Sequence, residues 1–281
     1  MALLAWYGAH RRSLPWRQAS DPYRILVSEV MLQQTQAQRV IAPYHRFLAM
    51  FPRVEALAQA SLAEVLVGWS GLGYNRRALR LHQAARLIER DGWPTTEQGL
   101  RHLPGVGPYT AAAVACFAFG AQVPCPDTNV GRVLSRWHGS HLEGEQLARA
   151  ARLELPHGRA SEWNQALMDL GATTCTARRP ACSSCPVQDW CAGPRGHRPP
   201  SSPTPFAGSR RQARGRVLRA LVDNHPSLGP SLGPSLGPSL GPQQLAQVTE
   251  LSLDQVADAV ASLEADGLIE ASGEGSYRLP A

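Results

Sequence analysis

Four of the chain's six cysteines lie in one short segment, at Cys175, Cys182, Cys185 and Cys191, with the spacing C-x6-C-x2-C-x5-C. Four thiolates this close in sequence can enclose one compact metal centre, which would constrain the whole segment around it. Zinc sites more often use two cysteine pairs separated by about a dozen residues or more. Disulfides are disfavoured in a cytoplasmic chain. The spacing therefore favours an iron–sulfur cluster, with zinc as the main alternative and disulfides as the weaker one.

Residues 1–192 are expected to be mostly helical. Asp21-Pro22 is a favoured helix start, Ser61 and Glu64 form a capping-box pattern, and Gly120 follows an Ala-rich apolar stretch as a helix stop. Few segments alternate with period two, so little sheet is expected. No apolar run reaches the length of a membrane span, and no secretion signal is evident at the first residues. We therefore expect a cytoplasmic protein with no membrane partner.

The composition changes after residue 192. Residues 193–210 are rich in Pro, Ser and Gly and are expected to form a linker. Residues 211–281 show helical patterns followed by a short hairpin around Gly273–Gly275, an order typical of a small winged-helix domain. Within it, Ser-Leu-Gly-Pro repeats over residues 227–242. Because such a repeat cannot build a core, we expect a flexible loop there.

The positive charge is concentrated before the C-terminal segment. The formal net charge is +6, yet residues 211–281 contain 5 Arg against 8 acidic residues. Because an excess of positive charge suits a polyanionic partner, a nucleic-acid contact is expected within residues 1–210. All 28 basic residues are Arg. Without lysine, the chain lacks the side-chain amine that Schiff-base catalysis usually employs.

Two carboxylates are candidate catalytic groups. Glu29 lies in the apolar stretch Ile25–Leu32, where burial would raise its pKa toward the value that a general acid needs near neutral pH. An exposed Glu on an amphipathic helix fits the pattern equally well. Asp127 precedes an apolar-periodic stretch, and its local sequence favours a plain helix N-cap over a catalytic role.

A glycine-rich turn, Leu103–Tyr109, joins two expected helices. Gly105 and Gly107 let the backbone approach a ligand closely, just before a helix N-terminus that attracts anions. An ordinary turn between helices is the alternative.

The segment Ser28–Gln36, SEVMLQQTQ, resembles the MutY-type adenine DNA glycosylases of the helix-hairpin-helix, or endonuclease III, superfamily. The cysteine spacing and the Leu-Pro-Gly-Val-Gly turn fit the same family, and the resemblance covers residues 4–192. It implies a mainly α fold, with a six-helix barrel domain at 21–125 and an iron–sulfur domain formed by 1–20 and 126–192. It also implies that the four cysteines hold a structural [4Fe–4S] cluster.

The resemblance implies catalytic roles as well. Glu29 would protonate adenine N7 and assist the attacking water, while Asp127 would stabilise the cationic sugar. Tyr109 and Asn129 would orient this pair. Pro126 stands where the family usually has an aliphatic residue, a departure that bears on how the following helix begins.

Other residues are implied to contact DNA. Gln34 and Tyr74 would wedge into the base stack beside the extruded adenine, and the turn containing Gly105 and Gly107 would grip backbone phosphate. Arg178 and Arg179, inside the cysteine segment, would face phosphates. Asn75 replaces a second Tyr that is common in the family.

Tyr109 separates two subclasses of this superfamily. Lyases of the endonuclease III type have Lys at this position, whereas MutY-type enzymes have Ser or Tyr. The resemblance therefore implies a monofunctional glycosylase that acts on double-stranded DNA, where adenine is mispaired with 8-oxoguanine or guanine. Typical members also have a C-terminal Nudix-like domain that senses 8-oxoguanine. Residues 211–281 form a segment that is short for such a domain. We expect a monomer associated with the nucleoid.

Two other functions stay open. Thymine·guanine mismatch glycosylases also place Tyr after the turn, but they lack an acidic residue matching Glu29. An iron–sulfur DNA-binding regulator would use the winged helix, although the acidic balance of residues 211–281 counts against this. Five arginines cluster at the start of that segment: Arg210, Arg211, Arg214, Arg216 and Arg219.

Overall fold

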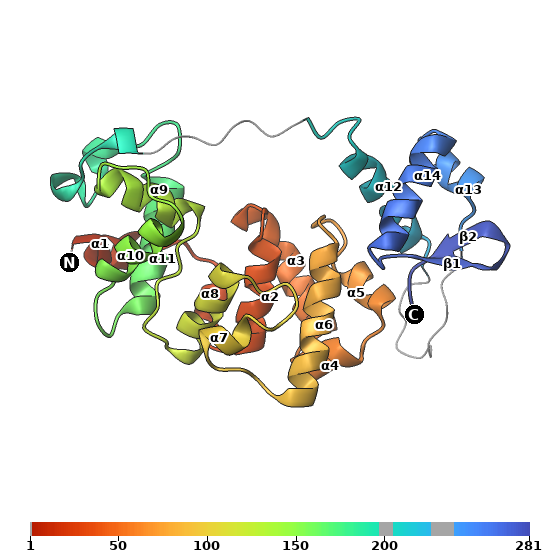
Figure 1. Ribbon diagram of the computed structural model, residues 1–281, viewed down its shortest axis with the longest axis horizontal. Coiled ribbons are helices and arrows are strands. Elements are labelled where there is room, and N and C mark those ends of the chain that lie inside the picture. Colours follow the sequence, from red (N-terminus) through yellow and green to blue (C-terminus); the bar gives the residue numbers. More distant parts are fainter. Residues whose placement is uncertain (1, 197–204, 226–238) are drawn as a thin grey trace. The chain divides into compact units, whose positions relative to one another are not determined.

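The computed structural model describes residues 2–196, 205–225 and 239–281, and it confirms a mainly helical fold (Figure 1). The chain forms two compact units. The first contains the described residues of Met1–Val30 and Pro94–Ser202, and the second those of Met31–Trp93 and Pro203–Ala281. None of the described helices has the length and apolar character needed to cross a bilayer. The domain limits implied by the resemblance stay predictions.

The first unit is a helical body around one apolar core, which is centred on α9 and α11. Leu134 of α9 and Leu167 and Leu170 of α11 are almost completely buried there. The elements of this unit are α1 (Ala2–His10), η1 (Pro15–Gln18), α2 (Pro22–Leu32, ending in the second unit), α7 (Glu97–Leu100), α8 (Pro108–Phe119), α9 (Thr128–Trp137), α10 (Gly144–Leu153), α11 (Ala160–Thr173), η2 (Cys182–Ser184), η3 (Gln188–Trp190) and η4 (Pro194–Gly196).

Ion pairs tie the N-terminal segment to α11. Arg12 Nε donates to Asp169 Oδ1 at 2.6 Å, and Arg17 Nη2 donates to the same oxygen at 2.7 Å. The Asp169 side chain is fully buried. Burial acts to raise the pKa of Asp169, but the hydrogen bonds and charges of the two arginines hold it below its ordinary value. The segment that leads into α2 is therefore anchored on the core helix.

The second unit begins with four helices: α3 (Ala37–Met50), α4 (Val54–Gln59), α5 (Leu62–Gly68) and α6 (Arg76–Asp91). Phe47, Leu57, Trp69 and Leu81 form its buried centre. Local signals act as predicted in both units. Ser61 and Glu64 form a complete capping box on α5, and Gly120 ends α8 with φ +70°.

The C-terminal part of the second unit consists of α12 (Arg210–Asp223), α13 (Pro242–Thr249), α14 (Leu253–Ala265), β1 (Glu270–Ser272), η5 (Gly273–Gly275) and β2 (Ser276–Arg278). The strands pair antiparallel, with Ala271 opposite Tyr277. Three helices followed by this hairpin match the order expected of a winged helix. Ala63 N of α5 donates to Pro280 O at 3.1 Å, so the C-terminal residues pack on α5.

The end of the Ser-Leu-Gly-Pro repeat differs from the expectation of a flexible loop. Leu240 pairs with Tyr277 through two backbone hydrogen bonds, and Pro242 is the first residue of α13. The last copy is ordered because its backbone extends the hairpin and its proline suits a helix start. Residues 227–238 of the repeat lie outside the described residues, as do residues 197–204 of the expected linker.

Candidate active site and cysteine centre

Glu29 is a buried acid. It lies on α2 with 5% of its surface exposed, and its Oε2 has no hydrogen-bond partner among the described residues. Burial raises the pKa of Glu29 to about 7. A hydrogen bond with Tyr109 opposes this shift, and the negative charge of Asp127 adds to it. Of the two interpretations that the sequence allowed, the buried one is correct, and the group can hold a proton near neutral pH.

Asp127 is both a helix cap and a neighbour of this acid. Its Oδ1 accepts from Val130 N at 2.7 Å at the start of α9, and its Oδ2 accepts from Asn129 Nδ2 at 3.0 Å. Burial raises the pKa of Asp127, while the hydrogen bonds from Val130 and Asn129 act to lower it. The capping role expected from local sequence is thus present, and it leaves the carboxylate close enough to act on Glu29.

Tyr109 joins the pair from a third element. It is the second residue of α8, and its hydroxyl hydrogen-bonds Glu29. Burial raises the pKa of Tyr109, and the charges of Glu29 and Asp127 add to this shift. The phenol therefore stays protonated and can donate to the acid. The first unit brings together Glu29 of α2, Tyr109 of α8 and the neighbouring Asp127 and Asn129 at the start of α9.

Arg132 is a buried residue of the site that sequence analysis missed. Its Nη2 donates to Asn129 Oδ1 and to Gly171 O, both at 2.7 Å. Its Nε donates to Cys175 O at 2.8 Å. One guanidinium thus links the Asn129–Asp127 pair to the first residue of the cysteine segment. The sequence could have indicated this contact, because Asn129 and Arg132 are three residues apart and so lie on the same face of α9.

Gly171 lets α11 approach α9 closely. A Cβ atom at this position would lie 2.6 Å from Asn129 Cβ and 3.1 Å from Asn129 O. We expect Gly171→Ala to lower the free energy of unfolding by about 2 kcal/mol and to slow catalysis by displacing Asn129. Gly8→Ala is the matched control, because nothing lies within 4 Å of its Cβ position on α1.

Alanine at Gly8 should instead stabilise the protein by about 0.5–1 kcal/mol through helix propensity. Chemical denaturation of both variants checks the opposite signs. Equal effects of the two substitutions would contradict the close approach at Gly171.

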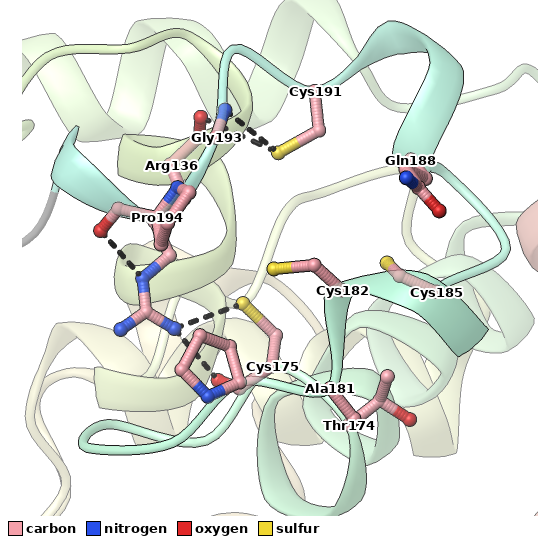
Figure 2. Close-up of a pocket in the computed structure, with 11 residues that line it drawn as sticks. Arg136, Thr174, Cys175, Ala181, Cys182, Cys185, Gln188, Cys191, Gly193 and Pro194 are labelled. Carbon is pink, nitrogen blue, oxygen red and sulfur yellow. Dashed lines mark hydrogen bonds between the residues drawn. The ribbon is translucent and has the colours of Figure 1, made fainter.

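The four cysteines of the segment line one cavity of about 300 Å³ (Figure 2). No group of three His, Cys, Asp or Glu side chains in the described part of the chain is close enough to hold a single metal ion. A cavity of this size, with sulfur atoms spaced around it, suits a polynuclear cluster better than one zinc ion.

Arg136 supports the cavity from α9. Its Nη1 lies 3.3 Å from Cys175 Sγ and donates to Thr176 O at 2.8 Å, and its Nη2 donates to Ala177 O at 2.9 Å. Gly193 N donates to a second sulfur, Cys191 Sγ, at 3.4 Å. Donors directed at thiolate sulfur stabilise its negative charge, as expected around a metal–sulfur centre. Sequence analysis missed Arg136 as well.

The predicted phosphate contacts lie at the surface of the first unit. Gly105 has φ +78° in the turn between α7 and α8, and Gly107 is the exposed N-cap of α8. Arg178 and Arg179 are exposed in the cysteine segment. Their positions fit the predicted role, which stays a prediction.

Gln34 and Tyr74 belong to the second unit. Gln34 is exposed in the turn after α2, and Tyr74 is 47% exposed in the turn before α6. Their side chains are therefore available to a ligand, and their wedge role stays a prediction.

Two regions of the chain match models of known protein families. Residues 27–156 match the HhH-GPD superfamily of base excision DNA repair proteins, and residues 175–191 match the iron–sulfur binding domain of endonuclease III. The second match begins and ends at the outer cysteines.

Several proteins of known name are similar to the chain. It is 42% identical to the adenine DNA glycosylase of Mycobacterium tuberculosis, over 99% of this chain and 92% of that protein. It is 43% identical to the human adenine DNA glycosylase, over 68% of this chain and 38% of that protein. A thermostable thymine-DNA glycosylase has a similar structure, with a TM-score of 0.66 and 32% identity, over 70% of this chain and 94% of that chain.

Endonuclease III trapped on DNA has the same fold, with a TM-score of 0.61 at 22% identity, over 69% of this chain and 92% of that chain.

Proposed function

Since this chain belongs to the adenine DNA glycosylases of base excision repair, which carry a [4Fe–4S] cluster, we propose that it hydrolyses the N-glycosidic bond of adenine mispaired with guanine or 8-oxoguanine. The observation that carries this proposal is Glu29, a buried acid whose pKa is raised to about 7 by burial and which lies beside a second carboxylate. An acid that holds its proton at neutral pH can donate it to a leaving base.

We propose that catalysis divides the work between the two carboxylates. Glu29 donates its proton to N7 of the extruded adenine, which makes the base a better leaving group. Cleavage of the glycosidic bond leaves a cationic sugar, which the negative charge of Asp127 stabilises. Ionised Glu29 then takes a proton from the attacking water, and the hydroxyl completes the sugar.

Two neighbours would hold this pair in place. Tyr109 fixes one carboxylate oxygen of Glu29 by its hydrogen bond and leaves the buried Oε2 to face the base. Asn129 supports Asp127 and is supported in turn by Arg132. These contacts orient the acid and the carboxylate without taking part in the proton transfer.

The four cysteines fit the cluster that the family carries. We propose Cys175, Cys182, Cys185 and Cys191 as its ligands, because all four line one cavity and Arg136 and Gly193 direct donors at two of the sulfurs. The bound cluster supplies a cross-link that holds residues 175–191 in one conformation. That conformation would present Arg178 and Arg179 to the phosphate backbone.

We further propose that the enzyme leaves the DNA strand intact. Tyr109 occupies the start of α8, and the chain contains no lysine to form a Schiff base with the abasic sugar. A monomer acting on nucleoid DNA is the form that we propose, because one chain carries both carboxylates and all four cysteines. Membership of the glycosylase family decides against the non-enzymatic regulator.

A single-turnover assay on duplexes containing 8-oxoguanine·A, G·A and G·T tests the proposed substrate. We expect adenine release from the first two duplexes. We expect no base release from G·T, because thymine is a pyrimidine and has no N7 that Glu29 could protonate. Strand breaks should appear only after treatment with alkali. Thymine release from G·T would support a thymine glycosylase, and breaks without alkali would contradict the monofunctional mechanism.

A further inference from the structure

Two turns of the second unit hold residues in left-handed backbone. Gln34 has φ +54° in the turn between α2 and α3, and Tyr74 has φ +47° in the turn between α5 and α6. Among the described non-glycine residues, only Glu250 shares this property. Such strain persists where surrounding contacts over-determine the backbone, and it occurs often at functional sites.

Arg77 reaches the first turn from the start of α6. Its Nη1 donates to Met31 O at 2.9 Å and to Gln33 O at 2.5 Å. These carbonyls lie at the C-terminal end of α2, where helix carbonyls have no partner within the helix. The positive guanidinium also suits the negative end of the helix dipole. Arg77 thus fixes the backbone directly before Gln34.

The same guanidinium holds the second turn. Its Nη2 donates to Gly73 O at 3.0 Å, immediately before Tyr74. The guanidinium carbon lies 5.3 Å from the centre of the Trp69 ring and 5.4 Å from that of Tyr74. Trp69 is fully buried, and its Nε1 donates to the same Gly73 oxygen at 3.1 Å. The second turn is therefore anchored to the core through Trp69 and to the first turn through Arg77.

Arginine is the side chain that can make this bridge. Its planar fork offers five donors in fixed directions and can stack on a ring, whereas lysine offers one ammonium group that cannot span two turns in this way. Burial lowers the pKa of Arg77 to about 10, so the group still carries its charge at neutral pH. The hydrogen bonds to Met31, Gln33 and Gly73 direct the guanidinium at the protein's own carbonyls.

We propose that Arg77 is a positioning residue for base extrusion, which presents Gln34 and Tyr74 to the duplex together by bridging their two turns. This inference rests on the proposed function, because it assigns the two exposed side chains to the base stack. Gln34 and Tyr74 would enter the base stack as one rigid pair. The conformational entropy of the two turns is then already lost before DNA binds, so ordering them does not weaken binding.

The test compares Arg77→Lys with Arg80→Lys, a control at an exposed residue of the same helix. Both variants carry Glu29→Gln, so that the bound adenine stays in place. 2-Aminopurine is placed next to the mispaired adenine, and its fluorescence rises when that neighbour leaves the stack. We expect Arg77→Lys to reduce the rise and Arg80→Lys to leave it unchanged. In the same two variants made with Glu29 intact, base release should slow by at least about tenfold for Arg77→Lys and stay at the parent's rate for Arg80→Lys.

Salt dependence separates positioning from direct DNA contact. If Arg77 acts on the turns, the charge-removing variant Arg77→Gln and the parent protein will lose affinity with salt along the same slope. A shallower slope, or a full fluorescence rise in folded Arg77→Lys, would overturn the proposal. Should Arg77→Lys fail to fold, Arg77→Gln is measured in its place, since its amide can reach one turn but not both.

The two proposals fail in distinguishable ways. If the parent protein releases no adenine from any mispair, the proposed function is wrong, whereas the fluorescence and salt measurements still report on Arg77.

Discussion

Replacing Glu29 by Gln should slow single-turnover adenine release by roughly a thousandfold, while the affinity for mispaired duplex stays within about threefold. The amide has the shape of the carboxyl group but no acidic proton that it can transfer to N7. Because Glu29 is buried among apolar residues of α2, the substitution changes little of the exposed surface that meets DNA. Base-release assays and a binding titration measure the two quantities separately. Near-normal base release would exclude Glu29 as the acid.

The pH dependence of the parent enzyme gives an independent measure. The donor form of Glu29 is lost as the pH rises through its pKa of about 7. Above that pH the single-turnover rate should fall by about tenfold per unit, because only the protonated fraction is active. A rate that stays constant from pH 7 to pH 9 would contradict the assignment.

The free energy of unfolding should also depend on the protonation of Glu29. The folded protein holds a proton on Glu29 up to about pH 7, whereas the ordinary pKa is 4.5. Stability therefore falls as the pH rises between these values, and above pH 7 the buried charge costs about 3 kcal/mol. Glu29→Gln lacks this cost, so thermal unfolding should show it to be more stable than the parent at pH 8. The difference should be much smaller at pH 4.5, and an equal difference at both pH values would argue against a buried, titrating Glu29.

Replacing Asp127 by Asn should slow base release by roughly a hundredfold or more, since the negative charge that stabilises the sugar cation is removed. Asn is as good an N-cap as Asp, so the hydrogen bond to Val130 N and the start of α9 should be kept. The variant thus separates the two roles of the residue. Its folding stability should fall by no more than about 1 kcal/mol, because the amide nitrogen that replaces Oδ2 loses the hydrogen bond from Asn129, while its rate of base release falls far more.

Asp21→Asn is the control for this change. Asp21 Oδ1 accepts from Tyr23 N at 2.9 Å at the start of α2, so the same chemical substitution is made at another helix start. The Asp21→Asn variant should release adenine at the same rate as the parent. Asp127→Asn should also shift the pH–rate break to lower pH, because the charge of Asp127 raises the pKa of Glu29. A slow Asp21→Asn, or an unshifted break in Asp127→Asn, would count against the proposed pairing.

Several features could be predicted because they depend on residues near one another in the chain. The capping box at Ser61 and Glu64 requires only a spacing of three residues, and Gly120 ends its helix by its own backbone freedom. The four cysteines lie within one short segment, so their spacing already indicated a shared centre. For Glu29 and Asp127, local pattern left the role open, and the resemblance to a family was needed to assign it.

The sequence by itself determined the helical character, the helix caps and the set of cysteines, since each follows from the chemistry of neighbouring residues. The tertiary structure alone decided the pKa of Glu29, the bridge made by Arg77 and the close approach at Gly171. These depend on groups far apart in the chain: Gly171 and Asn129 are 42 residues apart, Arg77 and Gln33 are 44 apart, and Glu29 and Tyr109 are 80 apart. The reason is physical: burial and hydrogen-bond partners are set by what packs around a group, and no spacing along the chain specifies that packing.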